Sequence, residues 1–260
     1  MRILVLLQAV PDLTGDLQVA PDGLSLAERG GGRVLNEFDE WALEEALQLQ
    51  AAGEGEVHVL VPQANGARDI LAAAWAKGAR RVFLLPGSWD GVGNWGLARA
   101  VAWVVQDLPS ELILTGMQSP KDADAGLGML LAGFLRRPHV NGVRRVSLAE
   151  ETAVVEKELA QGMVARFAVR LPAVLGLIGA RTAPRYLPLH RLRQAAQTVP
   201  VEELPAVTPS GPLPCTLRRL LAPPPARPTT FLRGDPSQVA DQLLAVLREQ
   251  HVGRWAQDAR

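Results

Sequence analysis

The stretch that decides the fold is residues 57–85. It begins with the apolar run Val57-His-Val-Leu-Val-Pro62 and ends with Arg81-Val-Phe-Leu-Leu85. Between these runs, residues 67–78 carry apolar side chains at helical spacing. A continuous apolar strand, a helix and a second apolar strand are typical of a βαβ unit, in which the two strands are parallel. We therefore predict an α/β fold.

The same alternation extends over the first 140 residues. Apolar runs at residues 3–10 and 111–114 predict two more strands, and residues 38–51, 95–108 and 126–136 predict three more helices. The expected result is a mostly parallel sheet with helices on both faces. Sheets of this kind bind ligands at the carboxyl ends of their strands.

Other segments depart from this alternation. The insert at residues 16–34 is rich in turn residues and is expected to form a hairpin, and Asn36 after it is expected to cap the first helix. Beyond residue 142 the sequence predicts strands without intervening helices, at residues 143–148, 153–159, 163–171 and 173–178. We expect these strands to form an antiparallel extension of the sheet.

The C-terminal part has a different composition. Residues 199–236 hold 10 of the 20 prolines, which excludes a helix or a central strand and favours an extended arm. Asp235-Pro236 then predicts the start of a helix over residues 237–251. We predict an α/β domain at residues 1–195, followed by an arm and terminal helix at residues 196–260. The arm and helix are expected to lie on the body or on a partner chain.

Composition excludes several functional classes. The 27 basic and 27 acidic residues balance, so the chain lacks the basic excess of a dedicated nucleic-acid binder. No apolar run reaches the roughly 20 residues of a membrane helix, so no membrane insertion is expected. Cys215 is the only cysteine, which excludes intrachain disulfides. The apolar start is broken by Gln8 and Pro11 and lacks a cleavage site, so we expect a strand and a cytoplasmic protein.

The sequence shows no obvious catalytic set. The four histidines are far apart and none has metal-ligand spacing, so no metal site is predicted. Asp122 and Asp124 form either a carboxylate pair or, as we favour, two solvated loop acids. We therefore expect a binding or carrier function without catalytic residues.

Two segments are candidates for binding. Residues 115–128 follow a predicted strand and open a helix, where backbone N–H groups and glycines suit a phosphate; the alternative is an ordinary strand-to-helix turn. Residues 181–193 contain four arginines, one histidine, the only tyrosine and no acid. Mixed basic and apolar side chains suit a docking surface, although a surface helix with arginines lying along it would have the same composition.

Several motifs in order along residues 1–195 resemble the beta subunits of electron-transfer flavoproteins. Leu35-Asn-Glu-Phe-Asp-Glu-Trp-Ala-Leu-Glu-Glu-Ala46 is similar to the Asn-Pro-Phe-x-Glu-x-Ala-x-Glu-Glu-Ala segment of that family. Gly116-Met-Gln-Ser119 is similar to its adenylate loop. Later matches lie at Val155-Glu-Lys157, Leu171-Pro-Ala-Val174 and Pro184-Arg-Tyr186.

The resemblance implies a Rossmann-like, adenine-nucleotide-binding fold and a heterodimer. The alpha subunit of such a pair holds most of an FAD, which passes electrons from acyl-CoA and related dehydrogenases towards a quinone reductase. The beta subunit buries a structural AMP, and its arm embraces the alpha subunit. Phe38 matches an aromatic residue near the flavin. The implied cofactor-binding residues are Leu6, Asn36, Glu37, Phe38, Asp39, Pro62, Gly116, Met117, Gln118, Ser119, Asp122, Ala123, Asp124, Ala125, Gly126 and Leu127.

The resemblance also implies a docking site for the dehydrogenase. The docking leucine of the family falls at Leu189, and its neighbours Arg185, Tyr186, Arg191 and Arg193 complete the expected surface. Leu189 is expected to enter an apolar site on the dehydrogenase, while the arginines steer the encounter.

The sequence departs from the family at the phosphate loop, and alternatives remain. Ala125-Gly126-Leu127 stands where many members have Asn-Gln-Thr, which leaves only backbone donors for a phosphate. Some members hold a second FAD in place of AMP and bifurcate electrons. A stand-alone ATP-using enzyme of the same fold would need a Ser-Gly-Gly loop where this chain has Gln8-Ala-Val-Pro-Asp12. A dimeric ligand-sensing stress protein would not need the arm.

Overall fold

The structure is a computed structural model of the 260-residue chain. It describes residues 1–14, 17–27, 32–89, 91–121, 123–207, 217–224 and 229–249. The chain divides into two compact units, Met1–Leu221 and Ala222–Arg260, which are described separately below.

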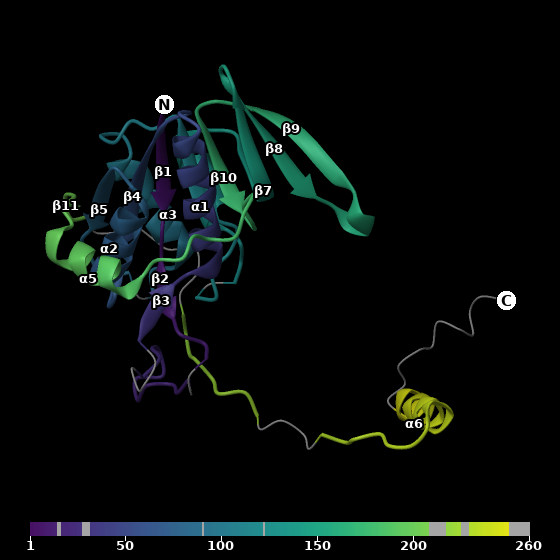
Figure 1. Cartoon of the computed structure of the whole chain (residues 1–260). Helices are drawn as coiled ribbons and strands as arrows, with labels where there is room; N and C mark the ends of the chain where they lie inside the picture. Colours follow the sequence, from purple (N-terminus) through teal and green to yellow (C-terminus); the bar gives the residue numbers. More distant parts are fainter. Residues whose placement is uncertain are drawn as a thin grey trace. The chain divides into compact units, whose positions relative to one another are not determined.

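The first unit is built on one nine-stranded sheet (Figure 1). Its order is β11 (Val201–Glu203), β5 (Arg81–Leu85), β4 (Glu56–Pro62), β1 (Arg2–Leu6), β6 (Leu112–Gly116), β10 (Ala173–Leu177), β7 (His139–Ala149), β8 (Thr152–Glu158) and β9 (Val164–Arg170). Neighbours are parallel from β11 to β7, and β8 and β9 extend the sheet in antiparallel pairing. The predicted mostly parallel α/β sheet with an antiparallel extension is confirmed.

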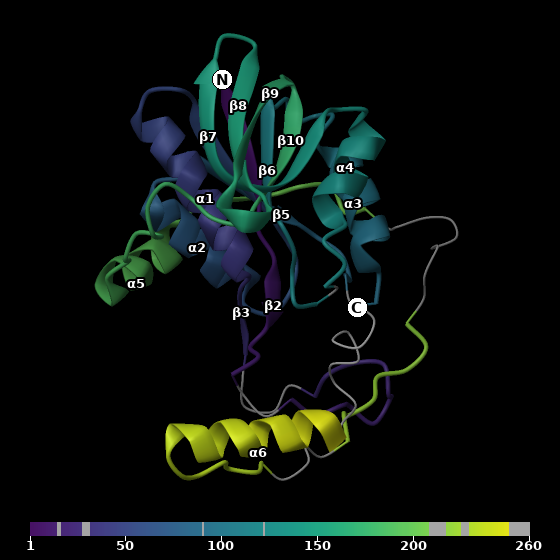
Figure 2. The ribbon, with the colours of Figure 1, turned by 90° about the vertical axis from the view of Figure 1, so that its right-hand side faces the viewer.

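Helices cover both faces of the sheet, as predicted (Figure 2). One face carries α1 (Glu37–Ala51) and α2 (Ala67–Lys77), with α5 (Leu189–Thr198) packed beside α2. The other face carries α3 (Gly93–Val104) and α4 (Leu127–Leu135), which pack on each other. A short 3-10 turn, η1 (Ala160–Gly162), joins β8 to β9.

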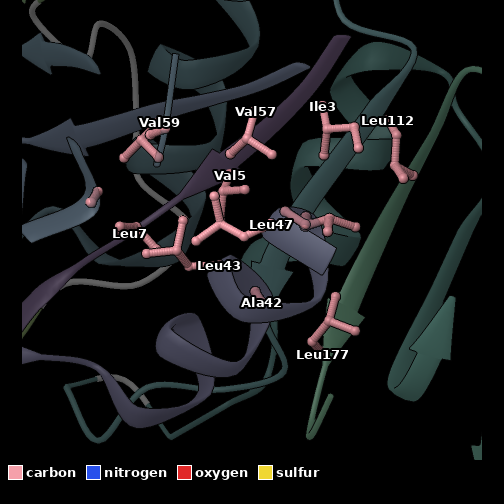
Figure 3. Close-up of a cluster of buried hydrophobic side chains, with 14 of the residues drawn as sticks. Ile3, Val5, Leu7, Ala42, Leu43, Leu47, Val57, Val59, Leu112 and Leu177 are labelled. Carbon is pink, nitrogen blue, oxygen red and sulfur yellow. The ribbon is translucent and has the colours of Figure 1, made fainter. Parts of the chain in front are cut away.

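Strand β1 is buried on both faces and contributes to two separate cores. Ile3 and Val5 pack with side chains from α1 and α2, whereas Leu4 and Leu6 pack with side chains from α3 and α4. Figure 3 shows Ile3 and Val5 on the side of the sheet that faces Leu47 of α1. Because successive side chains of a strand point to opposite faces, a strand covered on both sides needs a continuous apolar run.

The structure corrects two of the predicted elements. Residues 173–178 were expected in the antiparallel extension, but β10 lies inside the parallel part, between β6 and β7. The helix expected at residues 95–108 begins at Gly93 and ends at Val104. The helix ends early because the N–H groups of Asp107 and Leu108 donate to the carbonyl oxygens three residues back, which tightens the chain before Pro109.

The predicted hairpin after the first strand is present where the structure describes it. Strand β2 (Ala9–Pro11) pairs in antiparallel register with β3 (Arg33–Leu35), and an isolated bridge joins Val19 to Leu26. Residues 15–16 and 28–31 of the insert lie outside the described residues.

The body continues beyond the expected boundary at residue 195. Helix α5 spans that position, and β11 then adds an edge strand to β5 within the proline-rich segment. Two exposed ion pairs hold the edge: Arg81 to Glu202 at 2.5 Å and Arg68 to Glu203 at 2.6 Å. An edge strand tolerates nearby prolines because only one side of it must pair.

The second unit contains the predicted terminal helix, α6 (Pro236–Glu249). Asp235 caps it as expected: its Oδ1 accepts from the Gln238 N–H at 2.9 Å, and Gln238 Oε1 accepts from the Asp235 N–H at 3.2 Å. This reciprocal pair is a capping box. The predicted end of the helix at His251 lies outside the described residues. Across the ranges that the structure describes, there is no helix with the length and apolar character needed to cross a membrane.

Candidate functional site

The carboxyl ends of β1 and β4 border a small crevice with a cavity volume of about 20 Å³. Apolar walls come from Trp89 and Leu97, and Arg33 and Lys121 contribute basic groups. Lys121 Nζ donates to the Trp89 carbonyl oxygen at 2.8 Å, which links the loops after β5 and β6. Of the predicted cofactor-binding residues, Pro62 is the one that lines this crevice.

Asp39 ties three chain segments together at the edge where the parallel strands end. The residue is 1% exposed; its Oδ2 accepts the Gln8 N–H at 2.8 Å and its Oδ1 accepts the Gly116 N–H at 2.8 Å. Asp39 therefore joins the start of α1 to the ends of β1 and β6. Burial raises the pKa of Asp39 to about 7, although hydrogen bonds from Gln8, Gly116 and Asn36 act in the opposite direction.

Gly116 permits the close approach of α1 to β6. A Cβ atom at this position would lie 2.4 Å from Asp39 Oδ1 and 2.8 Å from the Asp39 nitrogen, which leaves no room for a side chain. The same Cβ would lie 2.8 Å from the Cβ of Phe38. Half-buried Phe38 is thereby held against the carboxyl end of β6.

Asn36 has a different role from the expected one. It occupies the N-cap position of α1, but its side chain makes no capping hydrogen bond. Instead its Nδ2 donates to the Gln118 carbonyl oxygen at 3.0 Å. The capping prediction is wrong because the buried side chain has a long-range partner in the loop after β6.

The loop between β6 and α4 already uses some of its backbone donors. The Gly126 N–H donates to Asp124 Oδ1 at 2.8 Å, and that oxygen also accepts from Asn94 Nδ2 at 2.5 Å. The Ala123 N–H donates to the Ser119 carbonyl oxygen. The buried Ser119 hydroxyl has no hydrogen-bond partner among the described residues.

The remaining predicted cofactor-binding residues are more scattered. Leu6 is fully buried in the core beneath α3 and does not reach the crevice. Glu37 is exposed, Ala125 is half-buried and Leu127 is buried. Met117 lines a separate depression with Asn141 and Lys157. Asp122 lies outside the described residues.

The docking segment, residues 181–193, crosses the surface beside α1 and α2. Tyr186 is 85% exposed and Leu189, the first residue of α5, is 56% exposed. Arg191 and Arg193 are also exposed. Arg185 differs, because its guanidinium is paired with the buried carboxylate of Glu44, with Nε 2.9 Å from Oε2. Arg185 is therefore an anchor of the segment, and its placement does not support the expected steering role.

Sequence reasoning missed two residues of this region, Glu44 and Glu45. They stand between apolar neighbours on α1, yet are 4% and 0% exposed. Adjacent acids within an apolar helical pattern were the available signal, since buried carboxylates are almost always paired. No group of three potential metal ligands occurs within the described ranges.

The fold and this edge define a mostly parallel α/β protein with a crevice at its strand ends. Comparison with known proteins makes the assignment more specific. Residues 23–209 match the family model described as "Electron transfer flavoprotein domain". The chain therefore belongs to the electron transfer flavoprotein family, as the motifs predicted.

Similar proteins are beta subunits. The electron transfer flavoprotein subunit beta of Methylophilus methylotrophus is 30% identical over 212 residues, which cover 78% of this chain and 79% of the relative. That of Thermoanaerobacterium thermosaccharolyticum is 29% identical over 187 residues, covering 72% and 71%. The mitochondrial beta subunit of Oryza sativa subsp. indica is 31% identical over 204 residues, covering 76% and 80%. The resemblance to beta subunits is thus confirmed.

Proposed function

We propose that this chain is the beta subunit of a heterodimer in which an alpha subunit holds most of an FAD. The pair would carry electrons from acyl-CoA or related dehydrogenases towards a quinone reductase, and this chain would supply no catalytic residues. The observation that supports the proposal is the junction of Asn36, Asp39 and Gly116, which holds Phe38 close to the carboxyl end of β6. A cytoplasmic location is part of the proposal.

The flavin, when bound, supplies the redox chemistry. The contribution of this chain is to shape one side of the flavin environment, with Phe38 as the contacting side chain. The Asp39–Gly116 hydrogen bond holds that side chain in place, since the start of α1 cannot move without breaking it.

We further propose that an AMP lies at the carboxyl ends of β1, β4 and β6. The crevice supports this by combining apolar walls with basic groups. The buried Ser119 hydroxyl, which has no partner among the described residues, lies in the loop after β6. Because the Gly126 N–H already serves Asp124 and the Ala123 N–H serves Ser119, a phosphate would be met by the N–H groups of residues 124, 125 and 127.

Nucleotide analysis of the purified heterodimer tests this assignment. Denaturation followed by mass spectrometry should release FAD and AMP in equal amounts. Two FAD molecules for each pair, without AMP, would indicate the bifurcating variant. Release of a single FAD for each pair, with no other adenine nucleotide, would contradict a nucleotide site in this chain.

A further inference from the structure

We propose that Glu44 and Glu45 of α1 are positioning residues that hold the docking segment in the orientation needed to meet a dehydrogenase. The inference rests on the proposed function, because it assumes that Leu189 contacts the dehydrogenase. It assigns a role to two carboxylates that neither bind a cofactor nor face the solvent.

Glu44 holds the middle of the docking segment through Arg185. Its carboxylate accepts the Arg185 backbone N–H at 3.0 Å, and the guanidinium donates to both oxygens, from Nε at 2.9 Å and from Nη2 at 3.0 Å. Arg185 also donates to the Lys77 carbonyl oxygen at 3.2 Å, at the end of α2. Burial raises the pKa of Glu44, but the hydrogen bonds from Arg185 outweigh it and the pKa lies below its ordinary value.

Glu45 holds the beginning of the segment through Arg181. The fully buried carboxylate accepts the Arg181 backbone N–H at 3.0 Å and the Val146 N–H at 2.7 Å. The Arg181 side chain completes the joint by donating to the carboxylate and to the Val146 carbonyl oxygen. Glu45 therefore fixes the segment to α1 and to β7 together.

The Glu44–Arg185 and Glu45–Arg181 contacts determine the path of the exposed residues that follow. Arg185 lies next to Tyr186 and four residues before Leu189, so its main-chain and side-chain bonds determine where the exposed chain leaves α1. Within the described part of the chain, residues 186–188 donate no hydrogen bond to the body. The segment is thus anchored before the docking residues and again where α5 packs on α2.

A preordered segment binds with a smaller entropic cost than one that must be ordered on contact. Loss of one anchor should therefore weaken docking while leaving electron transfer within the formed complex unchanged. A residue needed only for general stability would instead lower the yield of folded protein or change the flavin site. The distinction between these effects can be measured.

The test compares Glu44→Gln with Glu40→Gln in the purified heterodimer. Glu40 is a matched control, since it lies on the same helix and pairs with Lys77 Nζ at 2.6 Å but not with the docking segment. We expect Glu44→Gln to raise the apparent KM of a cognate dehydrogenase for the carrier about 2- to 10-fold, the range for ordering one further side chain on binding. Its kcat and flavin spectrum should match those of Glu40→Gln.

Hydrogen exchange over residues 181–192 supplies a readout independent of activity. Exchange should be faster in Glu44→Gln than in Glu40→Gln, and unchanged in Leu189→Ala. If Leu189→Ala raises KM but Glu44→Gln changes neither KM nor exchange, the positioning role is overturned and docking stands. If Leu189→Ala leaves KM unchanged, the docking proposal fails, and exchange alone decides whether Glu44 orders the segment.

A second variant covers a failure of Glu44→Gln to fold. Arg185→Lys keeps the positive charge beside Glu44 but cannot form the forked contact. It should show the same increases in KM and in exchange. Wild-type values for both in Arg185→Lys would overturn the inference.

Discussion

Asp39 makes the stability of the protein depend on pH. Its pKa is raised from 3.8 to about 7 in the folded state, so the folded chain binds this proton more tightly than the unfolded chain does. The associated stability is present at low pH and is lost as the pH rises from about 4 through about 7. Above that range the folded chain holds a charged, buried carboxylate, and only three hydrogen bonds offset the cost of removing that charge from water.

Replacing Asp39 with Asn should remove this pH dependence. Between about pH 5 and about pH 8, the free energy of unfolding of the wild type should decrease with rising pH. This decrease should exceed that of Asp39→Asn by roughly a few kcal/mol. Urea unfolding at both pH values measures the difference. Parallel pH profiles for the two proteins would show that Asp39 does not titrate in this range.

Leu189 is the residue whose loss should affect docking most directly. It is exposed at the start of α5, and burying one leucine side chain is worth roughly 1.5–3 kcal/mol, or about 10- to 100-fold in affinity. Leu189→Ala should raise the apparent KM of the dehydrogenase for the carrier at low and high salt. The contribution of Arg191 and Arg193 should fade as salt is added, because exposed charges are screened. An unchanged KM in Leu189→Ala would leave residues 181–193 as an ordinary surface segment.

Phe38 should affect the flavin if it contacts the ring. Phe38→Leu keeps most of the apolar volume but removes the aromatic face, so the flavin absorption spectrum or potential of the heterodimer should change. Phe134→Leu is the control, since Phe134 packs against Trp95 on the α3–α4 side, with ring centroids 5.1 Å apart. Equal spectra for both variants would make Phe38 a packing residue.

Among the elements, α6 is the clearest candidate for contact with the alpha subunit. None of its residues is buried, and Leu243 and Leu244 are 47% and 48% exposed. Because the first compact unit ends at Leu221, a chain that stops there keeps β11 and the whole sheet. This truncated chain should fold but fail to co-purify with the alpha subunit. Recovery of an intact heterodimer from the truncated chain would show that α6 and the preceding arm are dispensable.

The elements also show how far sequence patterns lead. Both apolar faces of β1, the helices over it and the capped start of α6 could be predicted, because burial and capping leave local signals. The position of β10 could not, since an apolar strand looks the same beside β6 as beside β9. The roles of Asn36 and Glu44 were hidden for a similar reason, because their partners lie 82 and 141 residues away.

At the scale of the whole molecule, α1 connects the proposed flavin contact at Phe38 with the docking segment. Its first turn carries Phe38 and Asp39 at the strand ends, and its middle holds the docking segment through Glu44 and Glu45. The same helix thus positions a flavin contact and a docking surface. Both surfaces would serve a flavin that this chain does not hold alone.

The visible spectrum of the purified chain, alone and co-expressed with its alpha subunit, tests that claim most directly. We predict that the chain alone is colourless. The pair should contain FAD, whose absorbance is bleached when a cognate dehydrogenase and its substrate are added without oxygen. A pair that does not form, or a pair whose flavin is not reduced by any dehydrogenase supplied with substrate, would contradict the account.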